Sequence, residues 1–110
     1  MSQIPKIFWK YSSERVLVME FVEGGYVNDL EYMRCHGISP KEVAEKLGTM
    51  YSNMIFTHGI VHCDPHPGNI IVRKNKKGKL ELCLLDHGLY TVSCALDVSC
   101  RVLNGQIDIR

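Results

Sequence analysis

The strongest constraint on the fold is a long amphipathic helix in the middle of the chain. Ser39, Pro40 and Glu42 form a helix start, with an N-cap serine, a proline at the first helical position and a glutamate at the third. Apolar side chains then recur at helical spacing as far as His58, and Gly59 ends the pattern. The sequence therefore predicts a helix of about nineteen residues, roughly 28 Å long, with one face in a core.

Strand-like segments precede this helix. Residues 7–11 and 15–22 are rich in aromatic and β-branched side chains, and the nearly continuous apolar character of 15–22 predicts a strand buried on both faces. A Glu-Gly-Gly break follows. Asn28 can then cap a short helix with Glu31 as its capping-box partner, and Gly37 can end that helix.

A β-hairpin is predicted after the helix. Residues 70–73 and 80–85 form two strands joined by an Asn-Lys-Lys-Gly turn. The basic run 73–79 is typical of a solvated turn, with an anion-binding patch as the alternative. Residues 91–110 show mixed polarity and no clear period, so a divergent or irregular tail is expected there. The mixture of helices and strands indicates an α+β protein.

Composition limits the class of protein. A chain of 110 residues is one domain or part of one, and its net charge of +1 gives no sign of nucleic-acid binding. The five cysteines form no C-x-x-C pair, which favours a reduced compartment over a disulfide framework or zinc ribbon. The sequence contains no stretch of about 18 apolar residues, so no membrane-spanning helix is expected. Residues 1–10 lack the pattern of a signal or transit peptide.

Three polar residues carry the chemical signal. Asp64 is followed five residues later by Asn69, and Asp86 lies in a turn of the type apolar-Asp-x-Gly. This layout is typical of a phosphoryl-transfer site, in which the first Asp meets the attacking hydroxyl. Asn69 and Asp86 then offer oxygen atoms suited to a hard cation such as Mg²⁺.

The chain resembles the UbiB/AarF-domain family of atypical kinases, within the protein-kinase superfamily. The residues that carry the resemblance are the run Val-His-Cys-Asp-Pro-His-Pro-Gly-Asn at 61–69, Leu-Leu-Asp-His-Gly at 84–88 and Val-Met-Glu-Phe-Val-Glu-Gly-Gly at 18–25. The resemblance implies a partial kinase-like α+β domain over residues 1–90. That part would contain the end of the N-lobe, the hinge, and the first part of the C-lobe with its catalytic loop and metal-binding turn.

The resemblance also implies roles for the catalytic segments. Asp64 matches the catalytic-loop Asp, and His66 stands where ordinary kinases have a Lys that contacts the γ-phosphate. His62 matches a structural His that holds the Asp86 turn by hydrogen bonding. His87 replaces the usual Phe of that turn, so the packing of the turn departs from the common pattern.

The implied ligands are ATP and Mg²⁺. Glu20 and Val22 match the hinge, whose main-chain atoms bind the adenine edge, and Asn69 and Asp86 would bind the metal and the nucleotide. The implied acceptor is an unidentified small molecule, lipid or protein. The resemblance further implies a mitochondrial location, a role in coenzyme Q or lipid metabolism, and peripheral membrane association of the full-length protein.

Other kinase elements are missing from the sequence. It contains no G-x-G-x-x-G loop, and no strand Lys or helix Glu precedes the hinge segment. We therefore expect a fragment that is inactive alone. Two alternatives remain open at this stage: a catalytically inactive, pseudokinase-type interaction fragment, and a transition-metal hydrolase in which His62, Asp64, His66 and His87 bind the metal. Pro65 and Pro67 count against the extended segment that the metal site needs.

Overall fold

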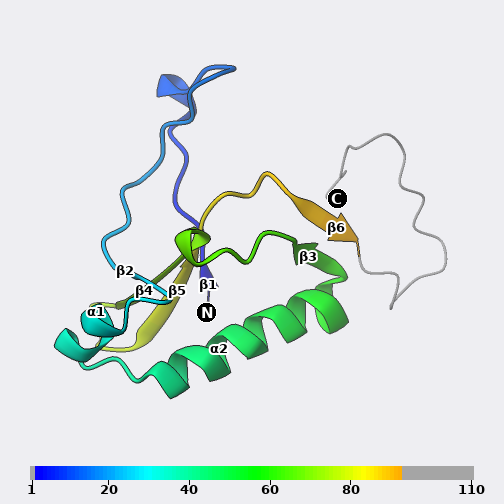
Figure 1. Ribbon diagram of the computed structural model, residues 1–110. Helices are drawn as coiled ribbons and strands as arrows, with labels where there is room; N and C mark the ends of the chain where they lie inside the picture. The colour runs from blue at the N-terminus through cyan, green and yellow to red at the C-terminus, as the bar shows by residue number, and fades with distance from the viewer. Residues whose placement is uncertain (1, 93–110) are drawn as a thin grey trace.

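The computed structural model describes residues 2–92. The elements in chain order are β1 Ser2–Gln3, a 3-10 helix Trp9–Tyr11, β2 Gly25–Tyr26, α1 Leu30–Cys35, α2 Pro40–Asn53, a π-helical segment Met54–His58, β3 Ile60–His62, a 3-10 turn Pro67–Asn69, β4 Ile70–Lys74, β5 Leu80–Leu84 and β6 Tyr90–Val92. The mixed α+β class is therefore confirmed (Figure 1). No helix in the described part is long and apolar enough to span a bilayer.

Two small sheets organise the chain. The larger sheet has the order β1-β5-β4-β2, in which β1 runs parallel to β5 and the other neighbours are antiparallel. In the smaller sheet β3 pairs antiparallel with β6, so that His62 lies opposite Tyr90. Figure 1 shows α2 along one side of the larger sheet, with the smaller sheet beyond its C-terminal end.

The predicted hairpin is confirmed as β4 and β5. Its turn is held by Asn75, whose side-chain oxygen accepts hydrogen bonds from the amides of Lys77 at 2.9 Å and Lys79 at 3.0 Å. Gly78 takes a φ of 71°, in the left-handed region that favours glycine. The turn residues therefore fix the register of the two strands.

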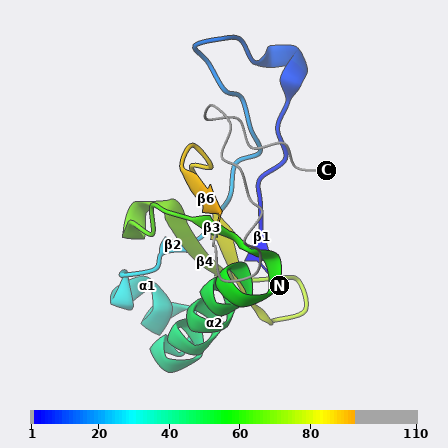
Figure 2. The same cartoon turned by 90° about the vertical axis from the view of Figure 1, so that its right-hand side faces the viewer.

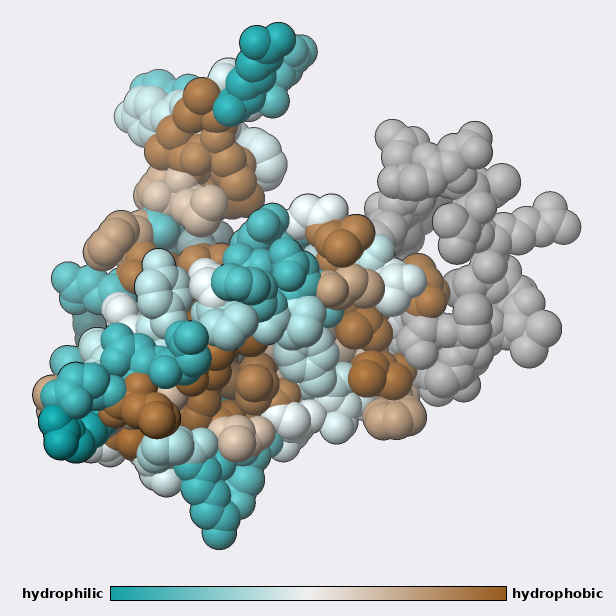
Figure 3. Space-filling view, in the orientation of Figure 1, coloured by the Kyte–Doolittle hydropathy of each residue, from teal (hydrophilic) through white to brown (hydrophobic). Residues whose placement is uncertain are grey.

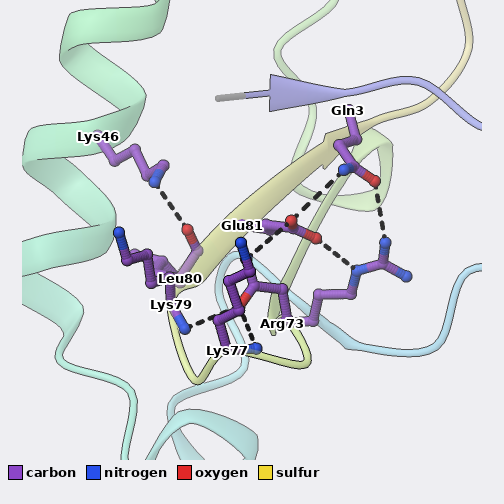
Figure 4. Close-up of polar contacts among 8 residues, drawn as sticks. Gln3, Lys46, Arg73, Lys77, Lys79, Leu80 and Glu81 are labelled. Atoms are coloured by element: carbon purple, nitrogen blue, oxygen red, sulfur yellow. Dashed lines mark hydrogen bonds and ion pairs between the residues drawn. The ribbon is translucent and has the colours of Figure 1, made fainter.

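A polar network crosses the strands of the larger sheet (Figure 4). The Glu81 carboxylate accepts from the Arg73 guanidinium at 3.2 Å, and Gln3 bonds to both residues. On the other side of β5, the Lys46 ammonium of α2 donates to the Leu80 carbonyl at 2.7 Å. These bonds join β1 to the hairpin and the hairpin to the long helix.

The short helix α1 begins one residue later than predicted. The N-cap is Asp29, whose carboxylate accepts from the Tyr32 amide at 2.9 Å, so the predicted cap at Asn28 is wrong. The predicted capping box is also not formed, because Glu31 pairs with Arg34 within the helix instead. Asp29 takes the cap position because its carboxylate reaches the amide of Tyr32 at the third helical position, and its own amide donates to the Tyr26 carbonyl at 2.9 Å.

Gly37 ends α1 as predicted. It has a φ of 62°, its amide donates to the Arg34 carbonyl at 3.3 Å, and the Ile38 amide donates to the Met33 carbonyl at 2.8 Å. This pair of bonds is the Schellman motif, which satisfies carbonyl groups at a helix end. The motif turns the chain so that Ile38 enters the core.

The long helix is confirmed over its whole predicted length. α2 covers Pro40–Asn53, the helix continues with π-type geometry through Met54–His58, and Gly59 ends it with a φ of 67°. Ser39 is the N-cap residue, although its side chain makes no capping hydrogen bond. The chain then enters β3 directly.

The core lies between α1, α2 and the larger sheet. Its buried residues are Met33, Ile38, Val43, Val72, Leu80 and Leu82, with Val27, Tyr32 and Leu47 packed against them. The backbone of β2 lies close to α1, because a Cβ atom at Gly25 would collide with the Tyr32 ring. This core fixes the long helix and the hairpin that flank residues 61–69, here called the motif loop.

Residues 4–22, here called the arm, differ from prediction. Residues 7–11 are not a strand, since Trp9–Tyr11 is a 3-10 helix. Residues 15–22 are not a buried strand either, because the Leu17 and Phe21 side chains are 53% and 86% exposed. Isolated antiparallel bridges, one of them Ile7 with Met19, join the two halves of the arm.

The arm extends away from the rest of the described chain, and Figure 2 shows this from the side. Apolar surface covers much of it (Figure 3). Residues 15–22 bond only to the first half of the arm, through Phe8 and Lys6 among others, and most of their apolar side chains stay exposed. Of the predicted tail, residues 91 and 92 lie in β6, and residues 93–110 lie outside the described residues.

Candidate functional site

One buried imidazole joins the motif loop to the Asp86 turn. His62, at the end of β3, is 1% exposed. Its Nε2 lies 2.7 Å from the Asp86 carbonyl and 3.2 Å from the Leu85 carbonyl, and its Nδ1 lies 3.3 Å from the Asp64 amide. Because carbonyl oxygens only accept, Nε2 carries the hydrogen and Nδ1 accepts. The predicted hydrogen bond from His62 to the Asp86 turn is therefore present.

Asn69 makes a second connection. Its side-chain Nδ2 donates to the Asp64 carbonyl at 3.1 Å, and its own carbonyl accepts from the Leu85 amide at 2.7 Å. The Asn69 Oδ1 has no hydrogen-bond partner among residues 2–92. The loop thus holds the amide group with its oxygen free for a cation.

Asp86 has the only left-handed backbone among the described residues other than glycine, with a φ of 52°. Asp tolerates this region better than most residues. Its exposed carboxylate makes one long contact, in which Oδ1 lies 3.4 Å from the Gly88 amide. The Asp64 carboxylate makes no hydrogen bond to another residue of the described part. These carboxylate and amide oxygens are ligands that suit Mg²⁺.

His66 is exposed and caps the 3-10 turn Pro67–Asn69. Its Nδ1 accepts from the Gly68 amide at 3.1 Å, and its Nε2 has no partner among the described residues. The ring is therefore held at the loop surface with one nitrogen available to a ligand.

His87 and Tyr90 form a polar pair beside the turn. The His87 Nε2 lies 2.9 Å from the Leu84 carbonyl, and its Nδ1 lies 2.6 Å from the Tyr90 hydroxyl. The two rings stack at 5.9 Å, and each meets the His62 ring edge to face. Burial raises the pKa of Tyr90 above its ordinary value. Sequence reasoning missed Tyr90, because its role depends on the pairing of β6 with β3.

Tyr51 of α2 was also missed, because in the sequence it reads as one more residue of the apolar stripe. Its hydroxyl is buried without a hydrogen-bond partner in the described structure. The pKa of Tyr51 is raised above its ordinary value, and burial of the hydroxyl is the largest cause. The nearby Tyr90, Cys63 and Asp64 raise it further. The long helix thus places a hydroxyl close to the motif loop.

The predicted hinge residues lie in the arm. The Glu20 amide donates to the Lys6 carbonyl at 2.8 Å, and the Glu20 carboxylate accepts from the Lys6 amide at 3.3 Å. The Glu20 carbonyl and the Val22 amide have no hydrogen-bond partner among the described residues. No described hydrogen bond connects Glu20 or Val22 to Asp64, Asn69 or Asp86.

Two hollows lie away from the motif residues. One of about 300 Å³ lies between α2 and β5, and is lined by Lys46, Thr49, Met50, Asn53, Met54, His58 and Leu82. The other, of about 750 Å³, lies beside the hairpin turn, and its lining includes Glu20, Glu23, Arg73, Lys74 and Lys77. Asp64, Asn69 and Asp86 line neither of these two hollows; Asp64 and Asn69 are half-buried, and Asp86 is exposed.

The transition-metal alternative is not supported by the geometry. Both ring nitrogens of His62 are engaged with the backbone, and those of His87 with Leu84 and Tyr90. Residues 2–92 contain no group of three or more His, Cys, Asp or Glu side chains placed to hold a metal ion. Within the motif loop, the polar side-chain atoms without a described partner are the Asp64 carboxylate, Asn69 Oδ1 and His66 Nε2.

Comparison with known proteins identifies the class. The family model described as the ABC1 atypical kinase-like domain matches residues 1–95. The chain therefore belongs to the ABC1/AarF-domain atypical kinase family, and the resemblance noted in the sequence is confirmed. No solved structure matches the chain.

Several relatives are similar over most of this chain. An AarF domain-containing kinase 1 from Drosophila melanogaster is 59% identical over 88 residues, which is 80% of this chain and 17% of that protein. An AarF domain-containing protein kinase 1 from Xenopus tropicalis is 58% identical over 91 residues, or 82% of this chain and 17% of its own length. The ABC1 family protein MCP2 from Saccharomyces cerevisiae is 45% identical over 95 residues, 80% of this chain and 16% of that protein. The chain thus corresponds to a fragment of these relatives.

Proposed function

We propose that this chain carries the catalytic-loop half of a magnesium-dependent, ATP-using phosphoryl-transfer site. The observation that supports it most directly is the position of His62, which binds the Asp64 amide with one ring nitrogen and the Asp86 carbonyl with the other. A phosphoryl-transfer site needs its base and its metal ligands held at fixed relative positions. The buried imidazole supplies that restraint.

Each residue of the site then has a distinct role. The Asp64 carboxylate orients the acceptor hydroxyl and takes its proton. Asn69 Oδ1 and the Asp86 carboxylate hold Mg²⁺, which, when bound, neutralises charge on the transferring phosphoryl group. His66, with its Nε2 free at the loop surface, contacts a phosphate oxygen. These roles use the atoms that the described structure leaves without partners.

The kinase-lobe arrangement belongs to the same proposal. The free Glu20 carbonyl and Val22 amide are an acceptor and a donor two residues apart, which suits the edge of an adenine base. In this arrangement residues 20–22 of the arm are the hinge, the rest of the arm is the end of the N-lobe, and residues 25–90 begin the C-lobe. The arm and the catalytic loop would then contact opposite ends of one ATP molecule.

The wider role concerns the whole protein, of which this chain corresponds to about 17% in the Drosophila melanogaster relative. We propose a mitochondrial protein linked to coenzyme Q or lipid metabolism, with a small molecule, lipid or protein as acceptor and peripheral membrane association of the full-length protein. A second candidate is a catalytically inactive interaction fragment. The extensive exposed apolar surface of the arm favours that alternative for the chain alone.

The test is calorimetric titration of the chain with ATP, with Mg²⁺ present and absent. Wild type is expected to show saturable binding that needs Mg²⁺, and Asp86→Asn is expected to lose it because the substitution removes the negative charge of a metal ligand. Asp29→Asn is the matched control. It removes the same charge at the α1 cap, where Asn caps as well as Asp does.

Two results would contradict the proposal. Absence of heat from a chain shown by circular dichroism to be folded would leave the interaction fragment as the better explanation. Equal loss of binding in Asp29→Asn and Asp86→Asn would show a general charge effect in place of a metal site.

A further inference from the structure

We propose that Tyr90 is a positioning residue for the Asp86 turn, and that it acts through the ring of His87. The inference rests on the proposed function, because it concerns the metal ligand of that site. Neither the motif spacing nor the family match assigns a role to Tyr90. The argument depends on how the turn is held from both sides of Asp86.

The first step is the conformation of the turn itself. Asp86 has a φ of 52°, in the left-handed region that residues with a Cβ atom rarely adopt. Its side chain contributes only the 3.4 Å contact with the Gly88 amide. Other contacts must therefore maintain this backbone conformation.

The second step is the pair of imidazole rings on either side of Asp86. His62 donates to the Asp86 carbonyl at 2.7 Å, and His87 bonds back to the Leu84 carbonyl at 2.9 Å. The bond from His87 spans the residues before Asp86 and closes the turn as a loop. The ring of His87 must stay in one orientation for that bond to persist.

The third step is the hydroxyl of Tyr90, which fixes that orientation. The Leu84 carbonyl only accepts, so His87 Nε2 carries the hydrogen and Nδ1 accepts from the Tyr90 hydroxyl at 2.6 Å. The bond is short, and the rings are almost parallel, with 14° between their planes. A tyrosine hydroxyl is protonated at neutral pH, so that of Tyr90 can donate to His87.

The fourth step is that Tyr90 is itself fixed relative to the catalytic loop. It lies in β6, opposite His62 in β3, and its ring meets the His62 ring at 5.3 Å. The Cys63 amide also donates to the Leu89 carbonyl at 3.0 Å, next to this pair. Tyr90 thus holds the turn that contains Asp86 at a fixed position relative to β3, the strand that precedes Asp64.

The experiment is a double-mutant cycle with Tyr90→Phe, His87→Phe and both together, and with Tyr26→Phe as an exposed tyrosine control. Three quantities are measured for each: the thermal midpoint, ATP affinity with and without Mg²⁺, and the NMR signals of the Asp86 and Gly88 amides and the His87 ring nitrogens. His87→Phe removes the acceptor of the Tyr90 hydroxyl while keeping an aromatic ring.

A positioning role gives a specific result. Tyr90→Phe is expected to weaken Mg²⁺-dependent ATP binding about five- to tenfold while the affinity without Mg²⁺ stays unchanged. It should also move the Asp86, Gly88 and His87 signals. Adding Tyr90→Phe to His87→Phe should change neither the Mg²⁺-dependent ATP affinity nor the Asp86 and Gly88 amide signals further. Tyr26→Phe should leave both unchanged.

Other outcomes overturn the inference. A lower thermal midpoint with unchanged Mg²⁺ dependence would make Tyr90 a packing residue only, and additive effects in the cycle would show that it does not act through His87. If wild type itself shows no Mg²⁺-dependent binding, the proposed function fails, and the NMR signals decide the inference alone. Unmoved Asp86 and Gly88 amides in Tyr90→Phe would then refute it.

Discussion

At the scale of single residues, burial separates cysteines that look alike in the sequence. Cys83 lies in β5 and is 1% exposed, and burial raises the pKa of its thiol above the ordinary value of 9.0. Cys35 and Cys63 are exposed. Because the thiolate is the reactive form, both access and protonation protect Cys83.

We predict that iodoacetamide at neutral pH labels Cys35 and Cys63 at least about tenfold faster than Cys83. The measurement is peptide mapping by mass spectrometry after a series of short exposures. Labelling in denaturant is the control, since unfolding should make all three rates similar. Equal rates in the folded chain would show that β5 opens readily and that the core is not formed as described.

At the scale of secondary-structure elements, the sequence predicts those parts that depend on local signals. The helix from Pro40 to His58 has a start signal, a repeating apolar face and a terminating glycine, and the hairpin has its own turn residues. The arm could not be predicted, because burial of residues 15–22 requires partner segments that are not visible in local periodicity. β6 was missed for a similar reason, since three residues form a strand only through pairing with β3.

In the candidate site, too, the features that local sequence signals carry were predicted and those that depend on tertiary contacts were not. Asp64, Asn69 and Asp86 were recognisable from spacing alone, and the bond from His62 to the Asp86 turn followed from the resemblance. The Tyr90 contact with His87 and the buried Tyr51 hydroxyl depend on tertiary packing. The order of residues along the chain carries no information about such contacts.

Two glycines give opposite predictions at the element scale. Gly37→Ala is expected to destabilise the fold by about 1–2 kcal/mol, because the left-handed φ of 62° at the end of α1 disfavours a Cβ atom. Gly48→Ala is expected to stabilise it by about 0.5–1 kcal/mol, because Gly48 lies inside α2 and a Cβ there meets nothing within 4 Å. Urea denaturation measures both changes. The same sign for both substitutions would contradict the assigned helix boundaries.

At the scale of the whole molecule, a small core supports a large exposed apolar area. The buried cluster contains six residues, whereas Trp9, Tyr11, Leu17 and Phe21 of the arm are each more than half exposed. A domain with so little buried apolar surface has a small free energy of unfolding. Changes in the charge of partly buried groups should therefore be visible in its stability.

We predict that stability falls as the pH rises above about 9. Burial raises the pKa values of Tyr51, Cys83 and Tyr90 in the folded state, so the folded chain keeps protons that the unfolded chain has lost. Their contribution is complete below the unfolded pKa values and disappears as the pH approaches the folded ones. Urea midpoints from about pH 8 to about pH 11 measure the loss. Tyr51→Phe should make the decline shallower, and an unchanged slope would refute the contribution of Tyr51.

The single imidazole of His62 has a consequence for how ligands communicate. Because the Asp64 amide and the Asp86 carbonyl share one ring, whatever orders either segment restricts the other. In the proposed site, binding at the two positions would therefore be thermodynamically linked, and the linkage would be reciprocal. A cation that favours one orientation of the ring would raise the affinity for the acceptor by the same factor by which the acceptor raises the affinity for the cation. In such an arrangement, the order in which the ligands arrive does not change the free energy of the complete complex.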